Sequence, residues 1–355
     1  DVYKRQVTFY NSGSDSQWAD YRKDSYSAHF MNTASGIAFS DNGGFANTLD
    51  VQDANGNQNG YFSGCTLWEA DTAIYARINQ NGPELGSHWD MLHQSPFSVG
   101  IAAERDNIYW LFDGFHNTIA KYNFQDPHPD HEHGGEDHSD GIIYRYDEVV
   151  VDRVAGLSSH MVVDSLNDML YICDTGNQRV LRININSGEI GSILDSYGEN
   201  IEGYYSMINA DFETVIDSGL VLPTGIDIYN TFLLVSDYST GEIFIYDLQV
   251  PNQFQLTHTL ETGIVEDLMS IKVGPDGTIW FVSTNANKLY QILPPLNGDF
   301  DGDNSISLND FIVLLSHILN TNSITDENLF LADLNYDSVV DLLDLILLIL
   351  SLIHI

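Results

Sequence analysis

Hydrophobic and polar residues alternate along most of the first 293 residues, which is the pattern of half-buried β-strands. One unit recurs: a strand, a polar turn, an apolar strand, a turn that an acidic residue opens, and a third strand. Its clearest copy covers residues 160–183, and related copies begin at Ser98, Thr224 and Met269. A weaker copy near Ser35 is interrupted by a Gly- and Asn-rich insertion. Helical periodicity is nearly absent before residue 300, so the pattern predicts a mainly β chain built from repeats.

The copies begin about 45 to 64 residues apart, which is the spacing of four-stranded propeller blades with loop insertions. They resemble the NHL-repeat family of β-propellers, most closely in residues 170–180, LYICDTGNQRV, and the resemblance covers roughly residues 30–293. It implies a five- or six-bladed β-propeller over residues 7–293. Residues 7–30 could supply extra strands that close the ring against the last blade.

Asp113, Asp174 and Asp237 occupy the same turn in three of the copies. A short carboxylate at such a turn accepts hydrogen bonds from nearby backbone N–H groups. We therefore expect these three residues to stabilise their turns, in preference to a role in catalysis.

The composition changes after residue 293, where a short Pro-containing link (294–298) precedes two similar segments that start 34 residues apart. Ca²⁺ takes about six to eight oxygen ligands, and a twelve-residue loop supplies them from positions 1, 3, 5, 7, 9 and 12. Both segments fit this pattern in register, and an apolar stretch follows each. This predicts two calcium sites in a small α-helical domain over residues 299–349. The predicted ligands are Asp299, Asp301, Asp303, Ser305, Ser307 and Asp310 in the first loop, and Asp333, Asn335, Asp337, Val339, Asp341 and Asp344 in the second.

The duplicated loop and helix resemble a type I-like dockerin, and the resemblance covers residues 298–349. It implies that the two helices bind a cohesin module on a scaffold or surface protein, most often in systems that degrade polysaccharides. Asn304 and Ser338 stand at loop position 6, where that family has glycine. Because Ser tolerates a left-handed backbone less well than Asn, we expect the second loop to bind Ca²⁺ more weakly.

A second group of candidate metal ligands lies in residues 126–140, between two strands of one blade. His128, His131, His133 and His138 stand there among six carboxylates, a combination that suits Zn²⁺ or another transition metal. An equally good interpretation is a solvated insertion that binds such metals only adventitiously.

NHL-type propellers include the peptidyl-α-hydroxyglycine amidating lyases, in which histidines at the starts of separate blades hold Zn²⁺ on the central axis. The equivalent positions here hold Ser35, Ser98, His160, Thr224 and Met269. Only His160 matches, so a three-histidine axial site is not supported, and a lone histidine is more often structural. His93 and His116 could supplement His160, but the sequence alone does not bring them to the axis.

Charge narrows the range of partners. With 13 Lys and Arg against 51 Asp and Glu, the net charge of −38 repels nucleic acids and anionic membranes. The two cysteines, Cys65 and Cys173, are too few for a disulfide scaffold. The apolar stretch from Leu342 contains Asp344, so we expect no membrane span.

The two ends of the chain are related to each other through their coding DNA. Residues 1–6 and 350–355 can be written as translations of GATGTGTATAAGAGACAG and of its reverse complement, CTGTCTCTTATACACATC. These resemble a sequencing-library adapter, so we expect the natural chain to cover about residues 7–349. Any signal peptide would then lie beyond this sequence.

Together these features predict a secreted or cell-surface propeller protein that a calcium-dependent dockerin-like domain attaches to a cohesin-bearing scaffold. Its role would be the binding or degradation of extracellular polysaccharide, with a carbohydrate as the ligand of the propeller. Two alternatives remain: a metal-dependent propeller enzyme, either a lyase or a lactonase-like hydrolase, and a non-catalytic recognition propeller.

Overall fold

The computed structural model of the chain describes residues 6–78, 80, 86–126, 139–249, 254–293, 297–303, 305–321, 323–324, 329–335 and 339–353. The chain divides into two compact units. The larger contains residues 1–274 and 280–291, and the smaller contains residues 275–279 and 292–355. Each is described by itself below.

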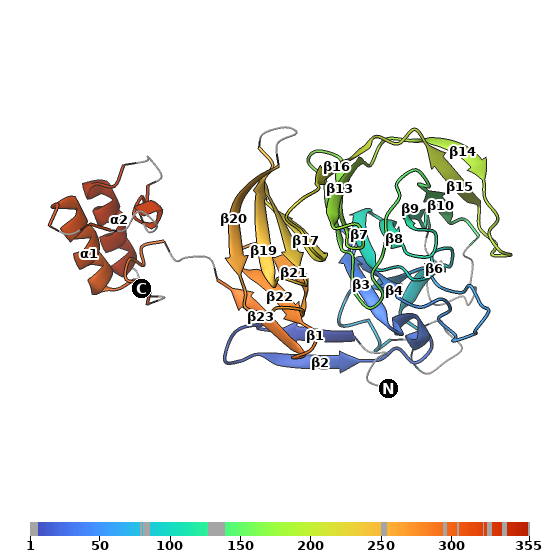
Figure 1. Ribbon diagram of the computed structural model, residues 1–355. Helices are drawn as coiled ribbons and strands as arrows, with labels where there is room; N and C mark the ends of the chain where they lie inside the picture. Colours follow the sequence, from blue (N-terminus) through green and yellow to red (C-terminus); the bar gives the residue numbers. More distant parts are fainter. Residues whose placement is uncertain are drawn as a thin grey trace. The chain divides into compact units, whose positions relative to one another are not determined.

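The larger unit consists mainly of five β-sheets, the blades of a propeller (Figure 1). Each blade begins with an inner strand, and the chain then runs outward through antiparallel neighbours. Blade 1 contains β3 (Ala34–Phe39), β4 (Gly44–Leu49), β5 (Cys65–Glu69) and β6 (His88–Leu92). Blade 2 contains β7 (Gly100–Arg105), β8 (Ile108–Asp113), β9 (Thr118–Asn123) and β10 (Ile142–Arg145).

The remaining blades follow in chain order. Blade 3 contains β11 (Met161–Asp164), β12 (Met169–Asp174), β13 (Arg179–Asn184) and β16 (Phe212–Ile216). Blade 4 contains β17 (Pro223–Tyr229), β18 (Phe232–Asp237), β19 (Glu242–Asp247) and β20 (Gln255–Glu261). Blade 5 contains β21 (Leu268–Val273), β22 (Ile279–Ser283) and β23 (Lys288–Ile292).

One excursion departs from this regular order. Between β13 and β16 the chain leaves blade 3 and adds β14 (Glu189–Ile193) and β15 (Gly203–Ile208) to the outer edge of blade 2. There β15 pairs with β10 in parallel, with Ile142 opposite Gly203. The loop between β14 and β15 is thereby carried to the side of blade 2 that adjoins blade 1, where Leu194 and Ile201 pack against a core cluster that contains residues of both blades.

The inner strands surround a central cavity of about 440 Å³. Each blade contributes at least one β-branched side chain to its lining: Ile37, Ile101, Val162 with Val163, Ile226 and Ile271. Such residues favour strands because their branched side chains pack well on a pleated surface. An apolar position on the inner strand of every blade therefore forms the wall of this cavity.

Glycine at the start of the inner strands allows neighbouring blades to approach closely. A Cβ on Gly100 would lie 1.9 Å from the carbonyl oxygen of Ser159, and a Cβ on Gly225 would lie 2.7 Å from the backbone nitrogen of Ile271. Both contacts join adjacent blades, so any side chain at these positions would force the blades apart.

The N-terminal segment forms β1 (Gln6–Tyr10) and β2 (Trp18–Arg22), followed by the short 3₁₀ helix η1 (Ala28–Met31). The two strands pair with each other and are not part of the sheet of blade 5. Their turn nevertheless lies against β23, since a Cβ on Gly13 would come within 2.5 Å of the Gln291 side chain. The expectation that this segment supplies strands to the last blade is therefore wrong in its pairing, although its turn does contact that blade.

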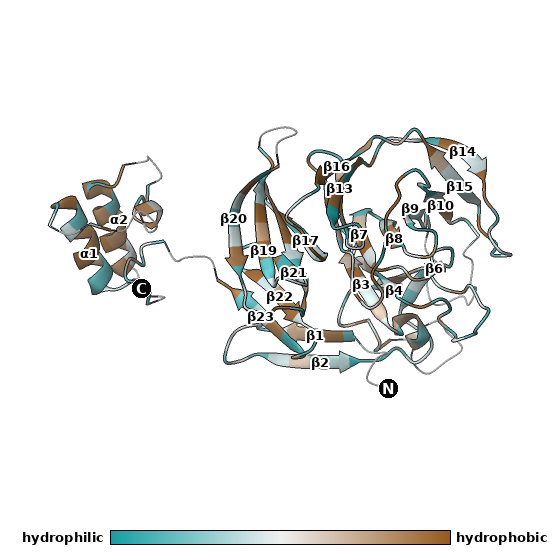
Figure 2. Ribbon diagram, in the orientation of Figure 1, coloured by the Kyte–Doolittle hydropathy of each residue, from teal (hydrophilic) through white to brown (hydrophobic). Residues whose placement is uncertain are grey.

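The smaller unit is helical where the structure describes it, with α1 (Leu308–Ile318), η2 (Leu329–Leu331) and α2 (Leu342–Ile353). Its separate core includes Phe300, Leu314, Leu331, Leu345 and Leu348. Figure 2 shows hydrophobic residues along both helices and along many of the strands of the propeller. None of the helices in the described part of the chain has the length and hydrophobicity needed to cross a bilayer.

The predicted fold class is confirmed: the chain is mainly β, with five blades and a small C-terminal helical region. Cys65 and Cys173 are both buried and form no disulfide.

Candidate functional site

The first C-terminal loop brings three predicted calcium ligands together. One carboxylate oxygen from each of Asp299, Asp301 and Asp303 lies within 4.8 Å of the other two. Asp299 is buried and accepts hydrogen bonds from the backbone N–H groups of Gly302 (2.8 Å) and Asp303 (3.2 Å), which shapes the loop. Burial and repulsion from Asp303 raise the pKa of Asp301. A bound divalent cation would relieve that repulsion.

Asp310 closes this loop onto α1. Its carboxylate, fully buried, accepts the backbone N–H groups of Phe300 (2.7 Å) and Ser307 (2.8 Å), at the two ends of the loop. Ser307 is the N-cap of α1, and its side chain with that of Asp310 forms a capping box. Burial by itself raises the pKa of Asp310, but these N–H donors outweigh it and hold the pKa below its usual value.

The second loop repeats this closure. Asp344, also fully buried, accepts the backbone N–H groups of Leu334 (2.7 Å) and Asp341 (2.8 Å), each 34 residues after its counterpart in the first loop. The duplication predicted from sequence spacing is thus matched by a duplicated hydrogen-bond pattern.

The remaining predicted Ca²⁺ ligands belong to the same two loops. Ser305 donates its hydroxyl to Asp303 (2.6 Å). The described part of the second loop includes Asp333, Asn335, Val339 and Asp341, whereas Asp337 lies outside the described residues, as do Asn304 and Ser338 at loop position 6. The carboxylate and hydroxyl oxygens of the first loop are hard donors, so the residues present fit Ca²⁺.

The candidate transition-metal ligands are not brought together in the described structure. His128, His131, His133 and His138 lie outside the described residues. His160 lies in the wall of the central cavity, where burial and nearby Lys272 lower its pKa to about 4. Across the described residues, the Asp299 loop holds the one group of three or more His, Cys, Asp or Glu side chains close enough to share a metal.

The three turn aspartates of the propeller accept backbone hydrogen bonds, as expected from the sequence. Asp237 accepts four backbone N–H groups, from Val221, Leu222, Ser239 and Thr240, at 2.7 to 3.2 Å. Asp174 accepts the N–H of Asp152 at 2.8 Å. Both carboxylates therefore tie the turn of a blade to the segment that precedes the blade.

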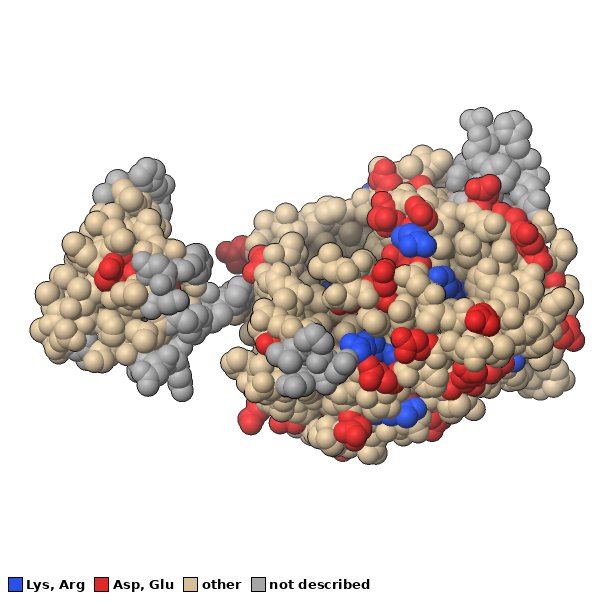
Figure 3. Space-filling view, turned by 90° about the horizontal axis from the view of Figure 1, so that it is seen from above, with Lys and Arg blue, Asp and Glu red and all other residues tan. Residues whose placement is uncertain are grey.

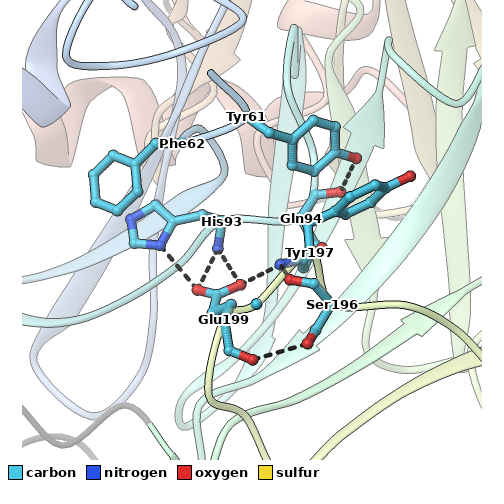
Figure 4. Close-up of a pocket in the computed structure, with 8 residues that line it drawn as sticks. Tyr61, Phe62, His93, Gln94, Ser196, Tyr197 and Glu199 are labelled. Carbon is cyan, nitrogen blue, oxygen red and sulfur yellow. Dashed lines mark hydrogen bonds and ion pairs between the residues drawn. The ribbon is translucent and has the colours of Figure 1, made fainter. Parts of the chain in front are cut away.

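A cavity of about 340 Å³ lies where blade 1 meets the loop between β14 and β15 (Figure 4). Tyr61 and Phe62 reach it from the segment between β4 and β5, and His93 and Gln94 reach it from the residues after β6. The opposite wall is formed by residues 196–199.

The partly buried carboxylate of Glu199 holds that wall in place. It accepts the His93 backbone N–H (2.9 Å) and the His93 Nδ1–H (2.8 Å), and the Gln94 side-chain amide also donates to it. The Gln94 amide donates in addition to the carbonyl oxygen of Ser196 (2.9 Å). Figure 4 shows the Glu199 carboxylate between the two side chains that bind it.

Asp113 differs from the other turn aspartates because it orients a histidine. Its Oδ2 accepts the Nδ1–H of His116 (2.7 Å), and Nε2 of that ring lies 3.0 Å from the Tyr61 hydroxyl. Burial and the nearby Asp113 raise the pKa of Tyr61, so its hydroxyl stays protonated and can donate to Nε2. His93 and His116 thus lie beside the Tyr61 cavity and are absent from the lining of the central cavity around His160.

Sequence reasoning missed this cavity because its residues come from three distant segments. The available signal was Tyr61 and Phe62 at the end of the Gly- and Asn-rich insertion that interrupts the first repeat.

Comparison with known proteins gives one family match, to the dockerin type I domain, over residues 297–353. No curated protein has a significant sequence match to the chain. Such a domain binds cohesin modules, and the family generally binds calcium.

Solved structures with a similar fold include the nidogen/laminin complex, with 12% identity, a TM-score of 0.45, and coverage of 73% of this chain and 75% of that chain. An auxiliary nutrient binding protein from Bacteroides ovatus has 11% identity, a TM-score of 0.43, and coverage of 78% and 61%. A catalytically inactive virginiamycin B lyase from Staphylococcus aureus with quinupristin has 13% identity, a TM-score of 0.42, and coverage of 81% and 85%. Likenesses this weak carry no argument about function.

The chain therefore carries a dockerin type I domain at residues 297–353 after a five-bladed β-propeller.

Proposed function

We propose that Ca²⁺ bound in the two C-terminal loops enables the dockerin domain to hold this protein on a cohesin-bearing scaffold or surface protein outside the cell. The match over residues 297–353 supports cohesin as the partner, because binding to cohesin is what this family of domains does. The propeller is then the cargo that docking brings to that scaffold.

The observation that carries the proposal is a repeated apolar surface on the two helices. Leu308 and Ile312 of α1 are exposed, and so are Leu342 and Ile346, the residues 34 positions later on α2. Residues four apart lie on one face of a helix, so each helix presents the same apolar pair to solvent. Exposed apolar surface on a small domain is typical of a protein-binding site.

Ca²⁺ would be held in the first loop by Asp299, Asp301 and Asp303 with the remaining ligands of that loop, and in the second by the equivalent set that begins at Asp333. The bound ion supplies positive charge that neutralises the clustered carboxylates. Asp310 and Asp344 each bind both ends of their loop, so the geometry of each loop is coupled to the start of the helix that follows it.

The test is a pull-down of the full chain on immobilised cohesin modules with Ca²⁺ present. Replacing Leu308 and Ile312 by Lys should weaken binding, as should replacing Leu342 and Ile346, because charged side chains would be buried at the interface. The matched control is Leu166→Lys, an exposed leucine in a propeller turn. Binding that survives loss of both helical pairs would refute docking through this surface.

For the propeller we propose recognition of an extracellular polysaccharide. The alternative of an enzyme, a lyase or a lactonase-like hydrolase, is favoured by the two carboxylate–histidine pairs beside the Tyr61 cavity, Asp113–His116 and Glu199–His93. Release of new reducing ends or unsaturated sugars from polysaccharides would favour the enzyme, and binding without product release would favour recognition.

A further inference from the structure

We propose that the cavity beside Tyr61 binds a sugar unit of an uncharged glycan, with the rings of Tyr61 and Tyr197 as its stacking surface. This inference deepens the proposed role of the propeller in polysaccharide recognition and is independent of docking. The cavity, about 340 Å³, lies at the lower end of the size range of small-ligand sites, which suits one or two sugar rings.

Three aromatic side chains line the cavity: Tyr61, Phe62 and Tyr197. The rings of Tyr61 and Tyr197 have centroids 4.4 Å apart, and Phe115 meets Tyr61 edge-on at 5.1 Å. Tyr197 is 59% exposed, although the cavity beside it is also lined by the buried polar residues His93 and Gln94. A sugar ring has an apolar face of C–H groups and a polar edge of hydroxyls, so it matches a surface on which tyrosine rings adjoin hydrogen-bonding groups.

The backbone of the turn at residues 196–199 holds the Tyr197 side chain in its exposed position. Tyr197 has a left-handed backbone, with φ of 53°, which is unusual for a bulky side chain. The next residue, Gly198, also has positive φ, and Ser196 and Glu199 close the turn through a backbone hydrogen bond of 3.0 Å. The Glu199 carboxylate then anchors this turn to blade 1 through His93. Strain of this kind persists only where surrounding contacts enforce it, and it is concentrated at functional sites.

Comparison among the blades gives a second reason to assign function here. Asp174 and Asp237 use their carboxylates to bind the backbone of the segment before the blade. At the equivalent turn of blade 2, the Asp113 Oδ2 binds His116, which contacts the hydroxyl of Tyr61. Oδ1 of Asp113 still accepts backbone N–H groups of its own turn, from Phe115 and His116, whereas Oδ2 fixes a histidine that contacts a residue lining the cavity.

The polar wall favours a ligand rich in hydroxyl groups. Gln94 Oε1 is buried in this wall and accepts no hydrogen bond from any described residue. A buried acceptor without a donor is unfavourable, so a ligand hydroxyl that reached it would be bound preferentially. The Tyr197 hydroxyl at the rim could serve a second sugar hydroxyl.

Charge argues against an anionic ligand. Glu199 contributes a carboxylate to the cavity wall, and the chain as a whole has a net charge of −38. Acidic side chains are spread over the face of the propeller seen in Figure 3, and basic side chains there lie next to acidic ones. An anionic polymer would meet repulsion at long range and at the site, whereas a neutral glycan would not.

The test measures binding of neutral hexasaccharides (cello-, xylo- and manno-) and of anionic polygalacturonate to the full chain by isothermal titration calorimetry. At least one neutral probe should bind, and Tyr197→Ala should weaken it at least about tenfold through loss of the stacking surface. Tyr197→Phe, which retains the ring, should restore most of the binding. Tyr21→Ala is the matched control, since Tyr21 is 63% exposed on β2. Unchanged thermal unfolding of the variants will show that their fold is retained.

Three outcomes would overturn the proposal: no neutral probe binds, Tyr197→Ala binds as tightly as the unmodified chain, or polygalacturonate binds best. A fourth is loss of binding in Trp18→Ala, because Trp18 stacks on Tyr10 at 4.2 Å and would be the true platform. Cohesin pull-down of the same variants separates this site from docking, since Tyr197→Ala should still be captured.

Discussion

Replacing Asp310 by Ala should strongly destabilise the dockerin domain while leaving the stability of the propeller unchanged. The change removes the acceptor of two short hydrogen bonds, from the N–H groups of Phe300 and Ser307, and of a longer one from Asp301 at 3.3 Å. A buried donor left without a partner costs about 1–3 kcal/mol, so the first two together cost roughly 4 kcal/mol. A domain of this size has a total stability of about 3–9 kcal/mol, so the loss of roughly 4 kcal/mol removes about half of that stability or more.

The assay is thermal unfolding of the full chain, followed by helical circular dichroism for the dockerin domain and by tryptophan fluorescence for the propeller. In a domain this small, 1 kcal/mol corresponds to about 4–8 °C in Tm, so Asp310→Ala should lower the helical transition by at least about 15 °C. Asp344→Ala should act similarly, because it makes the equivalent bonds in the second loop. Asn309→Ala, next to Asp310 and exposed, is the control. A shift of only a few degrees for both aspartates would mean that their carboxylates do not hold the loops closed.

Three further predictions concern the propeller. Asp237→Ala leaves four backbone N–H groups without their acceptor and should destabilise the propeller by about 3–5 kcal/mol in chemical denaturation, whereas the exposed Asp217→Ala should not. The pKa of His160 falls from 6.5 to about 4 in the folded chain, so between these pH values His160 gains a proton only in the unfolded chain. Its contribution should lower the stability by at most about 3 kcal/mol as pH falls from 6.5 to 4, and His160→Gln should remove that contribution and so flatten the measured dependence. Burial raises the pKa of the Cys65 and Cys173 thiols, so a thiol reagent at pH 8 should label neither in the folded protein and both after denaturation; labelling before unfolding would contradict their burial.

Much of the fold could be predicted from the sequence because the relevant signals are local. The blades are indicated by alternating hydrophobic and polar residues and by a turn that an acidic residue opens. Three of these turns, at Asp113, Asp174 and Asp237, form backbone hydrogen bonds as expected. The calcium loops are equally local, since all twelve positions lie in one short segment. The spacing of 34 residues then predicts the repeated closure by Asp310 and Asp344.

The features that escaped prediction depend on contacts between distant segments. Nothing near β14 and β15 indicates that they leave blade 3 for the edge of blade 2, because β15 pairs with a strand about 60 residues earlier. The cavity beside Tyr61 depends on that excursion, which brings Glu199 to His93 across 106 residues of sequence. In the sequence, His93 is a candidate to supplement His160 as an axial metal ligand. In the structure it instead anchors the loop between β14 and β15 through Glu199.

The most direct test of the central claim measures binding of the full chain to a panel of immobilised cohesin modules, first with Ca²⁺ and then with a chelator. The account predicts binding with Ca²⁺, its loss with the chelator, and a marked weakening by Asp299→Ala or Asp333→Ala, each of which removes the first ligand of a loop. The propeller's thermal transition should be unchanged in both variants. Binding that persists in the chelator, or that requires residues 126–140 in place of the two aspartates, would contradict calcium-dependent docking through this domain.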